Sequence, residues 1–207
     1  MTAFRRQFGA EDVELESTEA SFSGYFAIET LTLRHRLFAG GWSSSIRREL
    51  FQRGDAVGVL PWNPSTDEVV LIEQFRVGAT RGADSPWMLE LIAGVVEYGE
   101  SDSVVALREA QEEAGCQVSR LEPIATFYPS AGACSEQIRL FIGETRGADH
   151  GSVQGLESEH EDILVHQMAR SEALAMLNRG EVNNGHTLIA LQWLALHGDR
   201  LRADWHA

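Results

Sequence analysis

Three glutamates lie close together in the sequence: Glu109, Glu112 and Glu113. On an α-helix, residues three and four apart lie on the same face, so the three carboxylates would project near one another. Each such like-charge pair costs roughly 0.2–0.5 kcal/mol. Magnesium takes oxygen ligands and is often completed by substrate phosphates, so the trio predicts a site for a hard divalent cation. The alternative is a solvated helix face, which is the usual explanation of adjacent glutamates.

The residues around this trio fit a helix with a tight entry. Gly94 and Gly99 permit a tight loop before the helix, because glycine accepts backbone conformations that other residues avoid. Arg108 can brace a ligating carboxylate, and Glu100 would add support. The buried side of the helix is expected to consist of the apolar residues Val104, Val105 and Leu107.

The whole segment follows the pattern G-x5-E-x7-R-E-A-x-E-E-x-G-C from Gly94 to Cys116, which resembles the Nudix box at every defined position. The resemblance implies that Glu109, Glu112 and Glu113 bind magnesium, and that the carbonyl of Ala93 completes one metal site. Arg108 and Glu112 are further expected among the catalytic residues. The family fold is an α/β/α sandwich with a mixed sheet. Its members split a nucleoside diphosphate linked to another group.

A second acidic segment, Gly155 to Asp162, lies in a Gly-flanked stretch that is suited to move over a substrate. By resemblance, Glu159 would activate the attacking water and Glu161 would bind a metal. Because the chain has more carboxylates than one ion needs, we expect two or three magnesium ions, with manganese as the alternative. A solvated acidic loop is the competing interpretation of this segment.

Segments outside the box resemble the bacterial ADP-ribose pyrophosphatase branch of the family over nearly the whole chain. The matching segments are Arg47–Glu49, Asp67–Gln74, Pro86–Glu90, Gly155–Asp162 and Ile189–Leu194. In that branch an N-terminal arm is exchanged across a homodimer and contributes to the partner's site, and the products are AMP and ribose 5-phosphate.

The resemblance also implies a set of substrate-binding residues, namely Tyr25, Arg48, Arg53, Arg76 and Glu136. Guanidinium groups suit phosphate and ribose oxygens, and Tyr25 matches an aromatic that stacks on adenine. Each arginine could equally form an ordinary surface ion pair. Tyr25 could instead pack in the core of the arm, and Glu136 could be a surface residue.

One position departs from the ADP-ribose pattern. Members specific for ADP-ribose carry a proline about fifteen residues beyond the box, whereas this chain has Ala131 there and its nearest proline is Pro129. Hydrolysis of GDP-mannose or another nucleoside diphosphate sugar is therefore the alternative activity. A non-catalytic module that binds ADP-ribose is the alternative from another class of protein.

The remaining sequence predicts how these residues are positioned. Residues 1–53 are expected to form a small antiparallel β arm with strands at 13–15, 24–28 and 31–35, and residues 54–207 are expected to form the Nudix domain. In that domain, strands are expected at 56–60, 69–73, 87–92, 124–128 and 138–142, and a loop at 147–162. Helices are expected at 102–114, from a Ser171 cap to Gly180, and at 187–197. Strands followed by helices indicate a mixed sheet covered by helices.

The composition narrows the classes of partner. The formal net charge is −14, with all 17 basic residues being arginine, so nucleic acid and anionic membrane surfaces are unfavourable partners. The two cysteines, Cys116 and Cys134, are too few for a disulfide framework. No apolar run resembles a signal peptide or a membrane span. We therefore expect a cytoplasmic protein, and the resemblance implies that its partner is a small nucleoside diphosphate sugar.

Overall fold

The structure, a computed structural model, describes residues 4–82 and 85–206. The chain forms two compact units. The first comprises Met1–Gly54 and Tyr128–Glu136, and the second comprises Asp55–Phe127 and Gln137–Ala207. In the described ranges, no helix is both long and apolar enough to cross a membrane.

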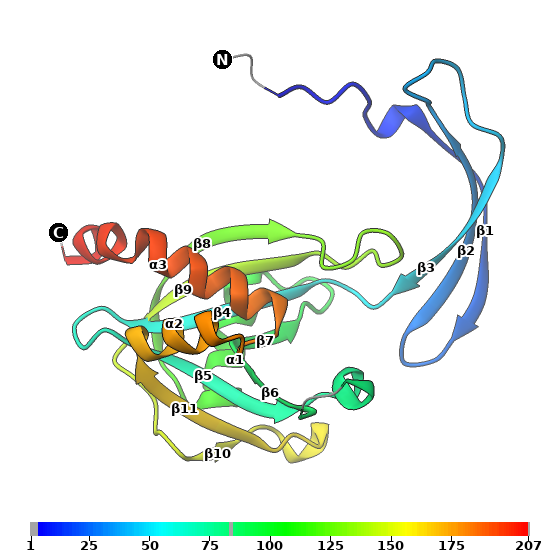
Figure 1. Cartoon of the computed structure of the whole chain (residues 1–207). Helices are drawn as coiled ribbons and strands as arrows, with labels where there is room; N and C mark the ends of the chain where they lie inside the picture. Colours follow the sequence, from blue (N-terminus) through cyan, green and yellow to red (C-terminus); the bar gives the residue numbers. More distant parts are fainter. Residues whose placement is uncertain (1–3, 83–84, 207) are drawn as a thin grey trace. The chain divides into compact units, whose positions relative to one another are not determined.

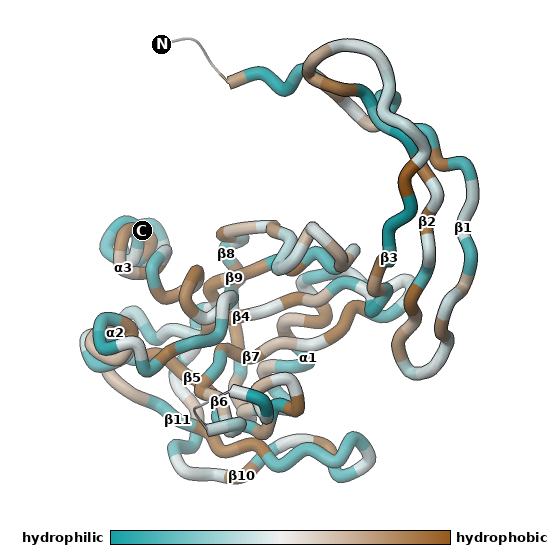
Figure 2. Tube along the Cα trace, turned by 45° about the vertical axis from the view of Figure 1, so that its right-hand side comes forward, coloured by the Kyte–Doolittle hydropathy of each residue, from teal (hydrophilic) through white to brown (hydrophobic). Residues whose placement is uncertain are grey.

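The first unit is built on a three-stranded antiparallel sheet in the order β1 (Val13–Ser23), β2 (Ala27–His35) and β3 (Ile46–Gln52). The short 3₁₀ turn Ala10–Asp12 precedes β1. Every residue of β1 is exposed, and Figure 2 shows hydrophilic and hydrophobic residues interspersed along β1 and β2. The expected antiparallel β arm is confirmed, but the expected strand 24–28 is wrong at residues 24–26, which form the turn between β1 and β2. β3 was not among the expected strands, because its charged residues Arg47, Arg48 and Glu49 obscure the strand pattern.

The second unit contains an eight-stranded mixed sheet (Figure 1). Its strands are β4 (Ala56–Asn63), β5 (Glu68–Phe75), β6 (Trp87–Glu90), β7 (Ile92–Val95), β8 (Val118–Phe127), β9 (Ile138–Thr145), β10 (Val153–Gln154) and β11 (Ile163–Ala169). The main order is β10-β11-β5-β4-β9-β8, with β6 paired to β5 and β7 paired to β4. β4 and β9 run parallel, and the other pairs are antiparallel.

Helices cover this sheet on both faces: α1 (Asp102–Ala114) on one, and α2 (Arg170–Arg179) with α3 (Gly185–His206) on the other. Alternate residues of β5 belong to different cores, since Val70 and Ile72 pack with α1 whereas Val69 and Leu71 pack with α2 and α3. Period-two alternation of apolar residues toward both faces is what a sheet buried between two helical layers requires. The expected α/β/α sandwich with a mixed sheet is confirmed.

Several expected boundaries differ from the structure. α2 begins at Arg170 with Ala169 in the cap position, so the expected Ser171 cap is wrong, whereas the expected end at Gly180 is correct. α3 extends well beyond the expected 187–197. The expected loop 147–162 contains β10 and the 3₁₀ turn Glu157–Glu159, and a further 3₁₀ turn spans Val77–Arg81.

Candidate active site

α1 carries two of its carboxylates on the face that packs on the sheet. The buried residues of the helix are Val105, Ala106, Ala110, Glu113 and Ala114. Val104 and Leu107 are exposed, so the expectation that they supply the buried side is wrong. Because residues four apart share a helix face, Glu109 and Glu113 follow Val105 toward the sheet. A wholly solvated face is therefore excluded for Glu113, which is 2% exposed.

The two ends of α1 are fixed by local sequence. The helix starts after Ser101, which has extended backbone angles. It ends at Gly115, whose left-handed backbone (φ 59°) lets its N–H return to the carbonyls of Ala110 and Gln111. Glycine adopts this conformation without the steric cost that a Cβ would bring. The expected helix 102–114 closed by Gly115 is thus confirmed, and the register of the three glutamates on it is set.

Glu113 is a buried carboxyl group beside β7. Its Oε2 accepts a hydrogen bond from the backbone N–H of Ala93 at 3.1 Å. The pKa of Glu113 is raised to about 8, mainly by burial and also by the nearby charges of Glu109 and Glu161, against the Ala93 hydrogen bond and the charge of Arg76. A carboxyl group with so high a pKa lacks full counter-charge, which a bound cation would supply.

Glu109 lies directly against the backbone of β7 at Gly94. A Cβ placed on Gly94 would be 1.9 Å from Glu109 Oε1, so only glycine leaves room for this carboxylate. Burial raises the pKa of Glu109; the charge of Arg108 opposes this shift. Gly94 lies within strand β7 and not in the tight entry loop that was expected for it, and its lack of a side chain provides the space in which Glu109 packs.

Arg108 joins three carboxylates of the segment. Its Nη1 lies 2.8 Å from Glu109 Oε1 and 2.9 Å from Glu112 Oε2, and its Nη2 lies 3.5 Å from Glu100 Oε2. Burial alone would lower the pKa of Arg108, but the carboxylates around it raise the pKa above its usual value. The guanidinium group thus holds Glu109 and Glu112 in fixed orientations, as a brace on metal-ligating carboxylates would.

The acidic loop, Gly155–Asp162, contacts the C-terminal end of α1. The backbone N–H of Gly155 donates to the carbonyl of Glu112 at 3.2 Å, and the N–H of Leu156 donates to Glu161 Oε2 at 3.0 Å. Glu161 is close enough to α1 that its charge raises the pKa of both Glu109 and Glu113. Glu159 is exposed on the 3₁₀ turn two residues earlier. The structure therefore brings Glu161 to the carboxylate helix and leaves Glu159 at the surface of the same loop.

Arg76 lies near enough to Glu113 that its charge lowers the pKa of this carboxyl group, against the effect of burial. It pairs with Glu90, a buried carboxylate whose Oε2 lies 2.8 Å from both Arg76 Nε and Nη2. Glu90 is a residue that the sequence analysis did not assign to the site. Gln74 is another, since it is buried on β5 and its Nε2 has no hydrogen-bond partner among the described residues. Two sequence signals pointed to them: both are polar residues inside strands, and each ends a segment that resembles the ADP-ribose pyrophosphatase branch.

The donor set fits a hard divalent cation. It consists of carboxylate oxygens, and one of them is a buried group with a strongly raised pKa. Within residues 4–82 and 85–206, however, no three His, Cys, Asp or Glu side chains form a ready-made metal-binding group. Glu109 and Glu112 instead engage Arg108, and Glu113 engages the backbone of Ala93. Each of these contacts uses one carboxylate oxygen, namely Oε1 of Glu109 and Oε2 of Glu112 and Glu113, so the second oxygen of each group could bind a metal ion.

The first unit contains four of the expected substrate-binding residues. Tyr25 lies in the turn between β1 and β2 and is 92% exposed, so the alternative that it packs in the core of the arm is wrong. Arg48, on β3, donates to the carbonyl of Arg47 at 2.8 Å. Arg53 pairs with Glu136 at 3.3 Å, and Glu136 is buried, so the alternative of a surface role for Glu136 is wrong.

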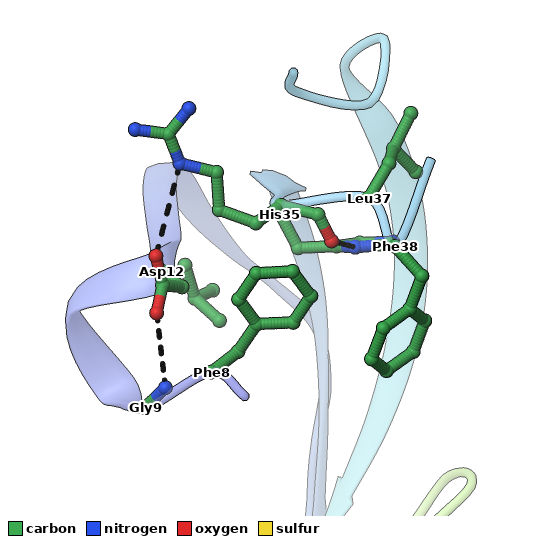
Figure 3. Close-up of a pocket in the computed structure, with 8 residues that line it drawn as sticks. Phe8, Gly9, Asp12, His35, Leu37 and Phe38 are labelled. Atoms are coloured by element: carbon green, nitrogen blue, oxygen red, sulfur yellow. Dashed lines mark hydrogen bonds and ion pairs between the residues drawn. The ribbon is translucent and has the colours of Figure 1, made fainter. Parts of the chain in front are cut away.

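A separate hollow of about 220 Å³ lies in the first unit beside the start of β1 (Figure 3). Phe8 and Phe38 stand side by side in it with ring centroids 5.1 Å apart, and an ion pair between Asp12 and Arg36 borders it. Its lining is mostly apolar and includes none of the expected site residues.

Residues 52–190 match the NUDIX domain family. The ADP-ribose pyrophosphatase of Escherichia coli K12 is 43% identical over 198 residues, which are 96% of this chain and 95% of that protein. A GDP-mannose pyrophosphatase of Citrobacter koseri is 34% identical over 149 residues, which are 72% of this chain and 77% of that protein. A solved structure described as an ADP compounds hydrolase has the same fold, with a TM-score of 0.71 at 19% identity, covering 95% of this chain and all of that one.

These matches agree with the geometry of the second unit. The whole mixed sheet, the carboxylate helix with its Arg108 brace and the Gly94 contact lie within the matched residues, and α3 begins within them. Nudix hydrolases generally use divalent metal ions, and the oxygen donors described above fit that use. With well over half of its length matched, the chain belongs to the NUDIX family.

Proposed function

We propose that this protein hydrolyses the pyrophosphate bond of ADP-ribose to AMP and ribose 5-phosphate, with magnesium as its metal. The observation that carries the proposal is the extent of the similarity. An ADP-ribose pyrophosphatase matches 96% of this chain, N-terminal arm included, at 43% identity, whereas a GDP-mannose pyrophosphatase matches 72% at 34% identity. The arm carries part of the proposed substrate-binding set, so similarity that includes the arm bears on the substrate.

The proposed metal ligands are Glu109, Glu112, Glu113, Glu161 and the carbonyl of Ala93, which together provide enough oxygens for two or three ions. Bound magnesium would withdraw charge from the diphosphate oxygens and lower the pKa of the attacking water. Manganese is the alternative metal. The burial of Glu113 and the charge of Glu161 near it support this set.

The chain's own side chains would perform the remaining tasks. Glu159 would accept the proton of the attacking water, and its exposed place on a loop joined to α1 suits this role. Arg76 would bind the diphosphate, for which a guanidinium fork is suited. Arg108 would hold Glu109 and Glu112 in place, and Glu112 would take part in catalysis. Further substrate contacts are proposed for Tyr25, Arg48, Arg53 and Glu136.

We further propose that the arm, residues 1–53, is exchanged in a homodimer, while residues 54–207 form the catalytic domain. The exposure of all of β1, with Val13, Leu15 and Phe22 among its residues, supports a partner surface for the arm. The cytoplasmic location expected from the sequence stays a prediction.

A panel of substrates tests the proposed function. Purified protein with magnesium is assayed against ADP-ribose, GDP-mannose, UDP-glucose, NADH, diadenosine polyphosphates and 8-oxo-dGTP. We expect the highest kcat/KM for ADP-ribose, with AMP as a product and loss of activity in Glu113→Gln. Preference for GDP-mannose would overturn the substrate and give weight to Ala131, where the ADP-ribose pattern has proline. Binding without turnover would favour the non-catalytic module, and normal turnover by Glu159→Gln would exclude Glu159 as the base.

A further inference from the structure

Arg76 stands at one end of a chain of hydrogen bonds that crosses the second unit. Beyond Glu90, Asn184 Nδ2 donates to Glu90 Oε1 at 2.6 Å, although the two residues are 94 positions apart. Asn184 Oδ1 in turn accepts from Thr187 Oγ1 at 3.1 Å, and Thr187 Oγ1 accepts from the backbone N–H of Leu91 at 2.9 Å. The start of α3 is thereby connected to Arg76 through a buried carboxylate.

Each bond in this chain has only one possible direction. The N–H of Leu91 can only donate, so Thr187 accepts from it and uses its single hydroxyl proton on Asn184. Asn184 Oδ1 accepts that proton, which leaves the amide nitrogen facing Glu90. Glu90 then accepts from Asn184 on one oxygen and from Arg76 on the other. The orientation of the Arg76 guanidinium is therefore set from α3.

Because these groups are buried, the loss of any of these hydrogen bonds is energetically costly. Thr187 is fully buried, and the Glu90 side chain is 2% exposed, whereas the Arg76 side chain is 41% exposed. A buried carboxylate needs all its partners, because leaving it unpaired is strongly unfavourable. The edge of the guanidinium formed by Nε and Nη2 is held by Glu90, and Nη1, which has no side-chain partner within residues 4–82 and 85–206, can donate to a ligand.

Asn184 also caps α3. Its Oδ1 accepts the backbone N–H of Thr187 at 3.2 Å, and its carbonyl accepts the N–H of Leu188 at 3.0 Å, which is the pattern of a helix N-cap. One side chain therefore begins the helix with its oxygen and holds Glu90 with its nitrogen. These two roles can be separated by mutation, because serine caps a helix but has no amide nitrogen to offer.

We infer that Asn184 is a positioning residue for the diphosphate: it acts through Glu90 to hold Arg76 in the orientation that binds substrate, and Thr187 holds Asn184. This assignment rests on the proposed function, in which Arg76 meets the diphosphate. It predicts a specific kinetic effect, because a misoriented Arg76 weakens substrate binding while leaving the carboxylates of α1 and the acidic loop in place.

The test is a double-mutant cycle on the full-length protein with magnesium and ADP-ribose. We expect Asn184→Ser to raise KM about tenfold with kcat within about twofold, the size of one lost charge-assisted contact. In an Arg76→Ala background the same substitution should change KM by less than about twofold, because its route to substrate is gone. An equal rise in both backgrounds, or an unchanged KM for folded Asn184→Ser, would overturn the inference.

Asn183→Ser, the same change at an exposed neighbour, is the matched control and should leave KM unaltered. Should Asn184→Ser not fold, Thr187→Val against Thr187→Ser tests the same chain. The serine variant keeps the hydroxyl and should retain the parent KM, whereas valine should raise it; equal KM values would contradict the inference. If the parent enzyme prefers another diphosphate conjugate, the ADP-ribose assignment is wrong but the inference about Asn184 is not affected. The double-mutant cycle is then run with that conjugate. With no turnover, ADP-ribose dissociation constants from calorimetry replace KM.

Discussion

At the scale of single residues, the site depends on carboxyl groups that are buried without full counter-charge. Glu113 and Glu109 lie on the sheet side of α1, where burial raises the pKa of each. Arg108 supplies counter-charge to Glu109, but in the described part of the chain it forms ion pairs with Glu100, Glu109 and Glu112 and none with Glu113. Glu113 is therefore the carboxyl group with the least counter-charge. Substitutions at Glu113 or at its neighbours should affect metal binding and stability separately.

Gly94→Ala should disable the site without unfolding the protein. The new methyl group would overlap Glu109 Oε1, so the carboxylate must leave its present position. We expect kcat/KM and magnesium affinity to fall about 10- to 100-fold, the range seen when residues that orient metal ligands are lost. Gly78→Ala is a suitable control, because nothing lies within 4 Å of the Cβ it would add. Equal activity of the two variants, measured with melting curves for both, would contradict the Gly94 role.

The raised pKa of Glu113 predicts a pH dependence of stability in chelator-treated protein. The folded chain keeps this proton up to about pH 8, whereas an unperturbed glutamate loses it near 4.5. Between these values the folded state binds more protons, so the free energy of unfolding should fall as pH rises and level off above about 8. Urea unfolding from pH 5 to 9 would measure it. Glu113→Gln, which cannot ionise, should give a shallower slope, and identical slopes would refute the assignment.

At the scale of elements, the acidic loop is positioned by its backbone. Gly155 has φ 103° and donates to Glu112 at the end of α1, and a Cβ there would be 2.6 Å from the Cβ of Glu161. The loop therefore depends on the absence of a side chain at this position. Glu161 and Glu159 follow within six residues, so a shift at Gly155 moves both of them together.

Gly155→Ala and Gly151→Ala form a matched pair that isolates this contact. Both positions have positive φ, so each variant should lose about 1 kcal/mol of stability from backbone strain. Only Gly155→Ala meets a neighbour, since nothing lies within 4 Å of a Cβ at Gly151. We expect kcat to fall at least about tenfold for Gly155→Ala and to stay near the parent value for Gly151→Ala. Parallel losses in both would show that the contact with Glu161 is unimportant.

The features that could be predicted from the sequence are those that depend on residues close together along the chain. The Nudix box fixed the helix 102–114, its Gly115 end and the identity of the clustered carboxylates, because all of these depend on residues within one short segment. The contact between Glu90 and Asn184 was not predicted, because it joins residues that are 94 positions apart in the sequence. Strand β11 was not predicted, because it follows an acidic loop without a turn signal. The predicted α3 was too short, because polar residues from Asp199 to Asp204 interrupt the apolar pattern of the helix.

At the scale of the whole molecule, the arm is the element whose surface is least explained by its own chain. β1 is exposed along its entire length, and Val13, Leu15 and Phe22 on it are open to solvent. A small sheet with so little buried apolar surface gains little stability alone. Contact with a second copy would supply the missing burial.

Light scattering during gel filtration tests the proposed dimer. We expect a mass twice the 22.9 kDa of one chain at micromolar concentration. The mass should persist in high salt, because apolar burial is not weakened by screening. Elution at 22.9 kDa under these conditions would exclude the exchanged arm.

The brace formed by Arg108 has a practical consequence for handling the enzyme. Because a permanent guanidinium already neutralises part of Glu109, Glu112 and Glu100, the charge repulsion of the segment is limited by a counter-ion that cannot be washed away. Removal of the metal should therefore abolish activity without unfolding the protein. Stocks could be stored in chelator as an inert form and switched on by adding magnesium when an experiment begins.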